Sequence, residues 1–126
     1  MMTVLLVGTG GFIGSVTRYL LGAWIQSASG NSWIPYGTLT VNVVGCFLIG
    51  FFIGLAETRQ FLGEGTRALI VVGLLGGFTT FSAFGYETIA MVREGHIVTA
   101  AANVGIQITL GLAAVLIGLK VSQSYG

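Results

Sequence analysis

The sequence predicts an all-α membrane protein with four transmembrane helices. Hydrophobic residues make up 54% of the 126 positions, charged residues only 7%, and the mean hydropathy is +0.93; soluble domains are far more polar. Four apolar segments approach the ~20 residues that cross a bilayer core: 3–25, 37–56, 68–92 and 97–119. No linker or block of charge divides the chain, so residues 1–126 are expected to form a single transmembrane domain.

The composition also argues against several functions. The net charge is +1 and the basic residues are scattered, so no basic stripe offers a nucleic-acid site. Cys46 is the single cysteine, which argues against an intrachain disulfide, zinc and redox chemistry. No set of nucleophile, base and orienting residue can be assembled, and no cluster of metal ligands is visible. We therefore expect no enzyme.

The first segment, 3–25, has no basic region and no clear cleavage site, so we expect a retained helix and not a signal peptide. Trp24, Trp33 and Tyr36 flank the connection that follows it, where amphipathic rings lie at the membrane interface. Arg18 lies within the apolar segment, where a cation at the centre costs about 2.5–3.5 kcal/mol. It can reach the interface and contact backbone carbonyls, or it can handle an ion; the first interpretation is favoured.

The second segment, 37–56, carries Thr38 and Asn42, which are four residues apart and project from one helix face. An asparagine in a membrane helix is most often a hydrogen-bonding contact between helices. The alternative is an amide donor that lines a path.

The third segment, 68–92, is interrupted by glycines and by the hydroxyls of Thr79, Thr80 and Ser82. Irregular backbone at bilayer depth survives only where protein or a water-filled cavity covers it, so we expect a break near Gly76–Thr79 that faces a buried site. Phe81 and Phe84 follow the break, and an amide together with the electropositive edges of their rings can hold a small anion. Simple packing is the alternative for both rings.

Two further features concern the membrane arrangement. Glu87, near the end of the third segment, needs water or a partner, and it either faces a vestibule or forms a structural pair.

A tight turn at 93–96 leads into the segment 97–119, and an even number of spans leaves both termini on one side.

The basic residues on the two sides of the membrane differ little in number, so orientation is weakly specified. Arg59, Arg67 and Lys120 lie on the side of the termini, whereas Arg93 lies on the other side and Arg18 near it. Two oppositely oriented copies could therefore pair, and a parallel dimer is the alternative. Glycines four residues apart predict close helix packing: Gly10 and Gly14, Gly50 and Gly54, Gly73 and Gly77.

Three stretches resemble the CrcB or Fluc family of fluoride channels, and together they cover nearly the whole chain. The first runs from Gly10-Gly11 through Gly14 to Arg18-Tyr19, and the second from Gly37-Thr38-Leu39 through Val41-Asn42 to Gly45. The third and most specific runs from Gly73 through Gly76-Gly77-Phe78-Thr79-Thr80-Phe81-Ser82 and Phe84 to Glu87.

The resemblance implies an antiparallel, dual-topology homodimer in the bacterial plasma (inner) membrane that exports fluoride passively and lowers its cytoplasmic concentration. It implies a structural sodium ion held between the copies by the backbone carbonyls of Gly76 and Thr79. Arg18 is assigned to structure or a vestibule. The implied fluoride path comprises Asn42, Phe81, Phe84 and Ser82, with Thr80 and Glu87 as further members.

The chain departs from the family pattern at Ala83 and at Leu110-Gly111, where family members usually carry hydroxyls. Asn103, Gln107 and Thr109 lie nearby, so the polar track along the third and fourth helices is expected to be thinner. Two alternative functions remain. A small dual-topology drug/proton antiporter needs a carboxylate in its first helix, which segment 3–25 lacks; a partner subunit of a heterodimeric fluoride channel would need a paralogue.

Overall fold

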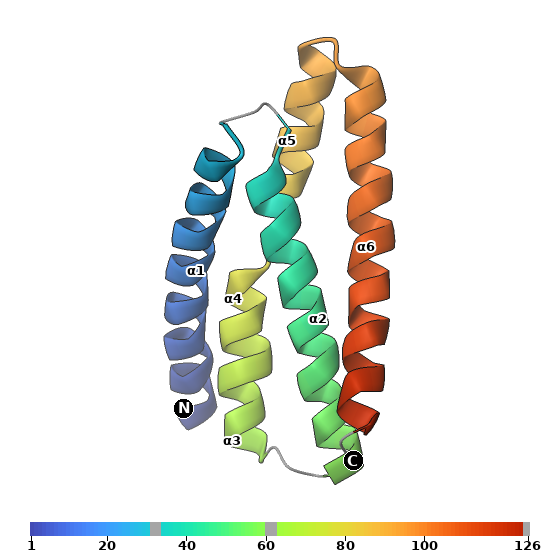
Figure 1. Cartoon of the computed structure of the whole chain (residues 1–126). Coiled ribbons are helices and arrows are strands. Elements are labelled where there is room, and N and C mark those ends of the chain that lie inside the picture. Colours follow the sequence, from blue (N-terminus) through green and yellow to red (C-terminus); the bar gives the residue numbers. More distant parts are fainter. Residues whose placement is uncertain (31–33, 60–62, 125–126) are drawn as a thin grey trace.

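The computed structural model describes residues 1–30, 34–59 and 63–124, and Trp33 lies outside them. Four spans run up and down (Figure 1): α1 (Met2–Ala28), α2 (Tyr36–Arg59), a third span between Glu64 and Arg93, and α6 (Ile97–Ser124). All four are long and apolar enough to cross a membrane. They extend a few residues beyond the predicted segments, because a helix continues past the hydrocarbon core into the interfacial region.

The third span is built from four pieces: α3 (Glu64–Arg67), the π-helical stretch η1 (Ala68–Leu75), α4 (Gly76–Phe78) and α5 (Phe81–Arg93). Thr79 and Thr80 lie between α4 and α5 in extended conformation, with φ/ψ of −88°/158° and −148°/118°. The predicted break is therefore present. The π-helical stretch before it was not predicted. π-Helices are rare in proteins, and those that do occur often lie at functional sites.

The position of the unwound residues corrects the sequence-based expectation. Gly76 and Gly77 are both helical, and the chain leaves the helix only at the two threonines. β-Branched side chains favour extended backbone, and Thr80 Oγ1 accepts a hydrogen bond from Ala83 N (3.1 Å), which caps the new helix. The threonines therefore make the break.

The glycines serve close helix packing, as predicted from their spacing. A side chain at Gly10 or Gly14 would collide with the backbone of the third span around Leu74, and one at Gly77 with Gly11. α1 therefore lies directly against η1 and α4. α2 and α6 approach each other in the same way, since Gly50 lies against the backbone of Val115.

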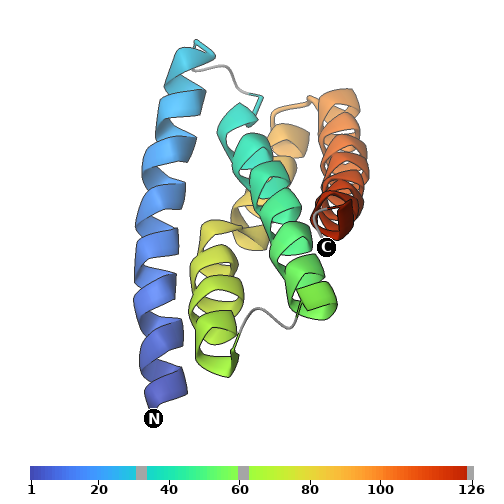
Figure 2. The same ribbon diagram turned by 60° about the horizontal axis from the view of Figure 1, so that its bottom comes forward.

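The third span changes neighbours at the break. Below it, η1 and α4 pack on α1; above it, α5 lies beside α6 (Figures 1 and 2). α2 lies between these two pairs and contacts α1, η1 and α6. Val41, which is only 1% exposed, lies on this central helix, and Leu75 and Phe78 are buried on the third span. The break is thus held at the middle of the bundle.

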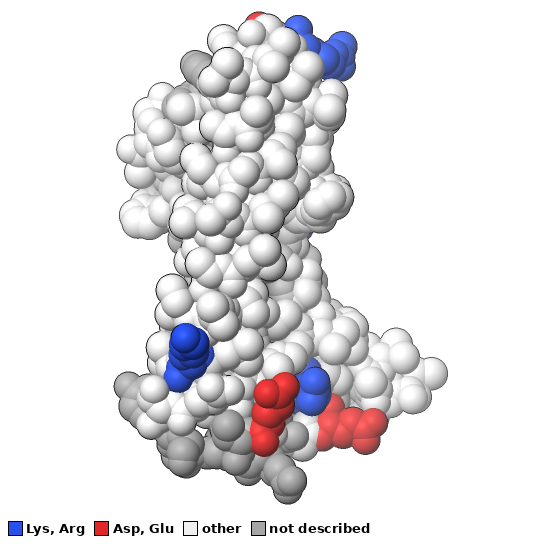
Figure 3. Space-filling model, turned by 90° about the vertical axis from the view of Figure 1, so that its right-hand side faces the viewer, with Lys and Arg blue, Asp and Glu red and all other residues white. Residues whose placement is uncertain are grey.

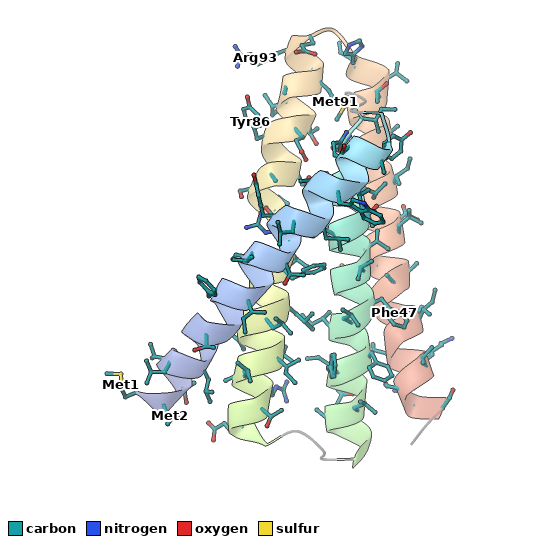
Figure 4. All side chains as sticks on the ribbon, turned by 60° about the vertical axis from the view of Figure 1, so that its left-hand side comes forward. Met1, Met2, Phe47, Tyr86, Met91 and Arg93 are labelled. Atoms are coloured by element: carbon teal, nitrogen blue, oxygen red, sulfur yellow. The ribbon has the colours of Figure 1, made fainter. Side chains whose placement is uncertain are left out.

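Both described ends of the chain lie at the same end of the bundle, as an even number of spans requires (Figure 1). On the face drawn in Figure 3, charged side chains gather at the two ends and leave a broad uncharged belt between them. Tyr86 and Arg93 project outward from α5 (Figure 4). α5 ends at Arg93, and Gly95, with φ of +87°, makes the turn into α6. The chain is a multi-pass membrane protein.

Candidate functional site

Asn42 binds Thr80, one of the two unwound residues, with both ends of its amide. Its Oδ1 accepts from Thr80 N (2.8 Å), and its Nδ2 donates to Thr80 O (3.0 Å). An extended residue inside a helical bundle has unpaired main-chain groups, and a side-chain amide supplies one acceptor and two donors. The contact between helices that was expected of Asn42 is present, and it holds the break open.

A groove of about 320 Å³ opens beside this contact, and we call it the amide–aromatic groove. Asn42 and Gln107 supply the two amides at its wall. Phe81 and Phe84 supply two rings whose centroids are 5.6 Å apart at 56°. The other lining residues are Gly45, Cys46, Ile49, Thr79, Thr80, Ile108 and Gly111. None of these described lining residues carries a charge.

A chain of side-chain hydrogen bonds leads from the groove into the space between α5 and α6. Asn42 Nδ2 donates to Gln107 Oε1 (3.2 Å), and Gln107 Nε2 donates to Asn103 Oδ1 (3.1 Å). Asn103 Nδ2 then donates to Thr88 Oγ1 (3.0 Å), whose hydroxyl donates to Phe84 O (2.8 Å). The sequence pointed to Asn103 and Gln107 as nearby polar residues. It missed Thr88, which is one turn along α5 from Phe84 and so could have been found by its spacing.

A second cavity of about 250 Å³, the charged cleft, lies on the other side of the break between α1, α2 and α5. Arg18, Thr38 and Glu87 line it. Arg18 Nε donates to Gly77 O (3.1 Å), the kind of backbone contact expected for this residue. Thr38 Oγ1 donates to Glu87 Oε2 (3.0 Å), whereas buried Glu87 Oε1 has no hydrogen-bond partner among the described residues.

Thr80 lines both cavities, so the break forms part of the wall between them. Gln26, which the sequence analysis missed, also lines the charged cleft. Its Nε2 donates to Ile34 O (2.9 Å) and its Oε1 accepts from Gly37 N (3.0 Å), so it ties the end of α1 to the start of α2. A polar residue just before a connection was the available signal.

Some predicted residues lie away from the groove. Ser82 is exposed and does not line either cavity; its Oγ lies 3.3 Å from Thr80 Oγ1. Thr109 lies on a different, exposed face of α6 beside Gly105 and Leu110. Ala83 lines the charged cleft, and Gly111 lines the groove. The polar part of the groove wall thus comes from two amides, Asn42 and Gln107, and two threonines, Thr79 and Thr80.

The described residues contain no group of three His, Cys, Asp or Glu side chains that could hold a metal ion. Backbone carbonyls at the break, in contrast, are possible ligands for a cation. In a continuous α-helix the Gly76 carbonyl would accept from Thr80 N, and the Thr79 carbonyl from Ala83 N. Those two amides donate to Asn42 Oδ1 and to Thr80 Oγ1. Both carbonyl oxygens are therefore deprived of their helical donors, and oxygens of this type are ligands for hard cations.

Comparison with known proteins gives matches that extend along almost the whole chain. Residues 5–119 match the family model described as CrcB-like protein, Camphor Resistance (CrcB). A Chloroflexus aurantiacus protein named fluoride-specific ion channel FluC is 40% identical over 100% of this chain and 99% of its own length.

Two further relatives carry related names. A Rhizobium johnstonii protein of the same name is 42% identical over 98% of both chains. A Methanosarcina barkeri protein, fluoride-specific ion channel FluC 3, is 38% identical over 97% of this chain and 91% of its own. With a family model spanning nearly the whole sequence and relatives this similar over their full length, the chain belongs to the CrcB-like family.

Proposed function

We propose that this chain forms a fluoride-selective ion channel that lets fluoride leave the cytoplasm passively. The names of relatives that are about 40% identical over their full length support this assignment. Within the chain, the observation that carries it is the amide–aromatic groove beside the break.

The chemistry of this groove suits a small anion that must pass and not stay. Phenylalanine ring edges are electropositive, and amide N–H groups donate hydrogen bonds. Phe81, Phe84 and Asn42 therefore offer partial positive charge without a fixed cation, which would bind fluoride too tightly to release it. Thr80 completes the wall. Ser82 lies outside the groove and contacts Thr80 through its hydroxyl, so its place on the path depends on the second copy proposed below.

The charged cleft is proposed as a vestibule. Arg18 raises the local concentration of anions, and its Nε contact with Gly77 O positions the guanidinium. Glu87 lies on the same cleft with Thr38 bonded to one oxygen. A carboxylate there limits how strongly an anion is held, since like charges repel at short range.

We further propose that the working unit is an antiparallel homodimer. Phe81 is 82% exposed in the single chain, a large exposure for a ring that follows a break at mid-membrane. Irregular backbone and open grooves at this depth need cover from protein. A second copy of opposite orientation supplies that cover, and the weak bias of basic residues between the two sides allows both orientations.

We also propose that a sodium ion binds between the two copies of such a pair. The carbonyls of Gly76 and Thr79 lack their helical donors, and Gly76 is exposed on the single chain. These residues fit a sodium ion, with two oxygens from each copy. The bound ion would supply positive charge that ties the two breaks together.

Fluoride efflux from liposomes that contain only this chain tests the function. We expect fluoride to leave down its gradient with little chloride, and we expect sodium in the buffer to be needed for a stable dimer. Passage of chloride at the same rate as fluoride, or proton-coupled uptake of an organic cation instead, would reject the proposal. Activity of this chain alone would exclude the need for a paralogous partner.

For the assembly, single cysteines in a Cys46→Ser background can be cross-linked at the break. An antiparallel pair brings the same mid-membrane residue of both copies together while residues at the two ends of α1 stay apart. Cross-links between equivalent terminal positions would indicate a parallel dimer.

A further inference from the structure

The amide of Asn42 has only one possible orientation. One side of it faces the backbone N–H of Thr80, which can only donate, and the other faces the Thr80 carbonyl, which can only accept. Turning the amide over would oppose donor to donor and acceptor to acceptor. Asn42 therefore always presents its NH₂ group toward Gln107.

The next members of the hydrogen-bond chain are not fixed in this way. Gln107 and Asn103 bond to each other, and Asn103 bonds to the hydroxyl of Thr88, which can donate or accept. Terminal amide torsions have two broad minima about 180° apart. The direction of these bonds is consequently set from one end, by the donor of Asn42.

Both N–H groups of Asn42 are used when the groove holds no anion. Thr80 O accepts one at 3.0 Å, and Gln107 Oε1 accepts the other at 3.2 Å. Gln107 Oε1 therefore occupies the position that an anion must take to reach Asn42. The bond to Thr80 is part of the break itself, so the bond to Gln107 is the one that an anion can displace.

We infer that Gln107 is a second anion-binding residue, which turns its amide over when an anion displaces its oxygen from Asn42. In the turned state Gln107 Nε2 donates to the anion from the side opposite Asn42 Nδ2. This inference rests on the proposed function, because it places fluoride in the amide–aromatic groove. Gln107 and Asn42 are the two amides among the described residues that line it.

The remaining bonds can follow without moving the helices. Asn103 turns over as well, so that its Nδ2 donates to Gln107 Oε1 and its Oδ1 accepts from the Thr88 hydroxyl. The hydroxyl gives up its bond to Phe84 O, a helical carbonyl that keeps its own backbone partner within α5. The buried amide of Asn103, only 8% exposed, thus stays hydrogen-bonded in both states. That satisfies the main requirement on a buried polar chain.

Four hydrogen bonds change between the two states: all four lie within the protein in the empty state, whereas in the turned state two lie within the protein and two go to the anion. The total is equal only when the anion is bound, so the anion selects between the states. A purely acceptor or purely donor side chain at position 107 cannot do this. The device gives the two amides of the groove wall, Asn42 and Gln107, a shared role beside the hydroxyls of Thr79 and Thr80.

Side-chain NMR tests the inference directly, on the dimer in lipid nanodiscs with ¹⁵N-labelled Asn and Gln. Gln107→Leu assigns the Gln107 resonance by its disappearance. Adding sodium fluoride, with sodium chloride as reference, is expected to shift the NH₂ resonances of both Asn42 and Gln107. If fluoride moves the Asn42 resonance alone, the inference is overturned.

Binding and flux give an independent measure. The fluoride concentration that gives half of the maximal shift of the Asn42 NH₂ resonance, here called the half-shift, measures binding. In Gln107→Leu we expect this concentration to rise by about tenfold, because one hydrogen bond to a charged group is lost. Flux in liposomes is expected to fall with it. The matched control is Gln123→Leu, which removes an exposed amide near the end of the same helix.

The outcomes distinguish a failure of the proposed channel function from a failure of the role inferred for Gln107. No fluoride flux from the wild type and from Gln123→Leu rejects the proposed function. Normal flux and an unchanged half-shift in Gln107→Leu reject the role of Gln107 and leave the channel assignment intact. If Gln107→Leu fails to fold, the Gln107 resonance can be assigned in the wild type by elimination. Substitutions of the other three glutamines, Gln26, Gln60 and Gln123, identify their resonances, and the fourth belongs to Gln107. A fluoride-induced shift of that fourth resonance supports the inference, and its absence overturns it.

Discussion

The two cavities that meet at Thr80 differ in how they can attract an anion. The amide–aromatic groove has amides and ring edges but no charge among its described lining residues, whereas the charged cleft has Arg18 and Glu87. Full charges act over several ångströms and are weakened by salt, while hydrogen bonds act only at contact. The difference suggests that the cleft gathers ions and the groove selects them.

Asn42→Asp is expected to have the largest effect. The carboxylate cannot donate to Thr80 O or to an anion, and it repels fluoride inside the groove. Loss of a donor to a charged group, together with repulsion between the carboxylate and an anion, predicts a reduction in fluoride flux of about 100-fold or more. Liposome efflux measures it, with Gln123→Glu as a control that creates a carboxylate outside the groove. A rate within about threefold of the wild type would place the selective step elsewhere.

Phe81→Ile is expected to lower the fluoride flux by about tenfold, because the aliphatic side chain fills the space but has no electropositive edge. Phe84 is the partner ring, 5.6 Å away, and Phe84→Ile should act similarly. Phe52→Ile serves as the control, because the Phe52 ring packs edge-on against Phe51 on α2 and does not line the groove. If Phe81→Ile and Phe52→Ile have equal fluoride fluxes, Phe81 and Phe84 contribute only packing and do not contact the anion.

Arg18→Gln should lower the fluoride flux by about fivefold at low salt and by less at high salt, since screening shortens the reach of a full charge. The glutamine amide can still donate to Gly77 O, so the local structure is kept. Flux measured at two ionic strengths checks this. A defect that is independent of salt would indicate a structural role for Arg18.

Glu87→Gln is expected to have the smallest effect and the opposite sign. The amide oxygen can still accept from Thr38 Oγ1, while the negative charge in the cleft is removed. Fluoride flux should rise by up to about threefold at low salt. Glu94→Gln, at the exposed turn after α5, is the control. A fall in flux would mean that Glu87 takes part in conduction through more than its charge.

Sequence reasoning came closest to the structure where a local rule applies. Glycines four residues apart predicted close packing, and the threonines and glycines of the third segment predicted a break. The exact site of unwinding differed, because glycine can also remain helical when a neighbouring helix approaches it. Gly77 does so against Gly11, and the extended backbone falls to Thr79 and Thr80.

Contacts between distant segments followed no local rule. Asn42 was recognised as a polar residue on a helix face, but its bond to Thr80, 38 positions away, depends on how α2 crosses the third span. The same holds for Gln107, whose place on the groove needs α6 to pack beside α2. Thr109, two residues on, looked equivalent in sequence and points away.

Hydrophobicity and residue order by themselves determined the membrane class, the number of spans, the shared side of the termini and the interruption of the third helix. These properties follow from burial of apolar surface and from backbone preference, both of which are local along the chain. The tertiary structure alone decided which polar groups meet. Hydrogen bonds form only within about 3 Å, so helix packing determines that Thr80 separates a neutral groove from a charged cleft.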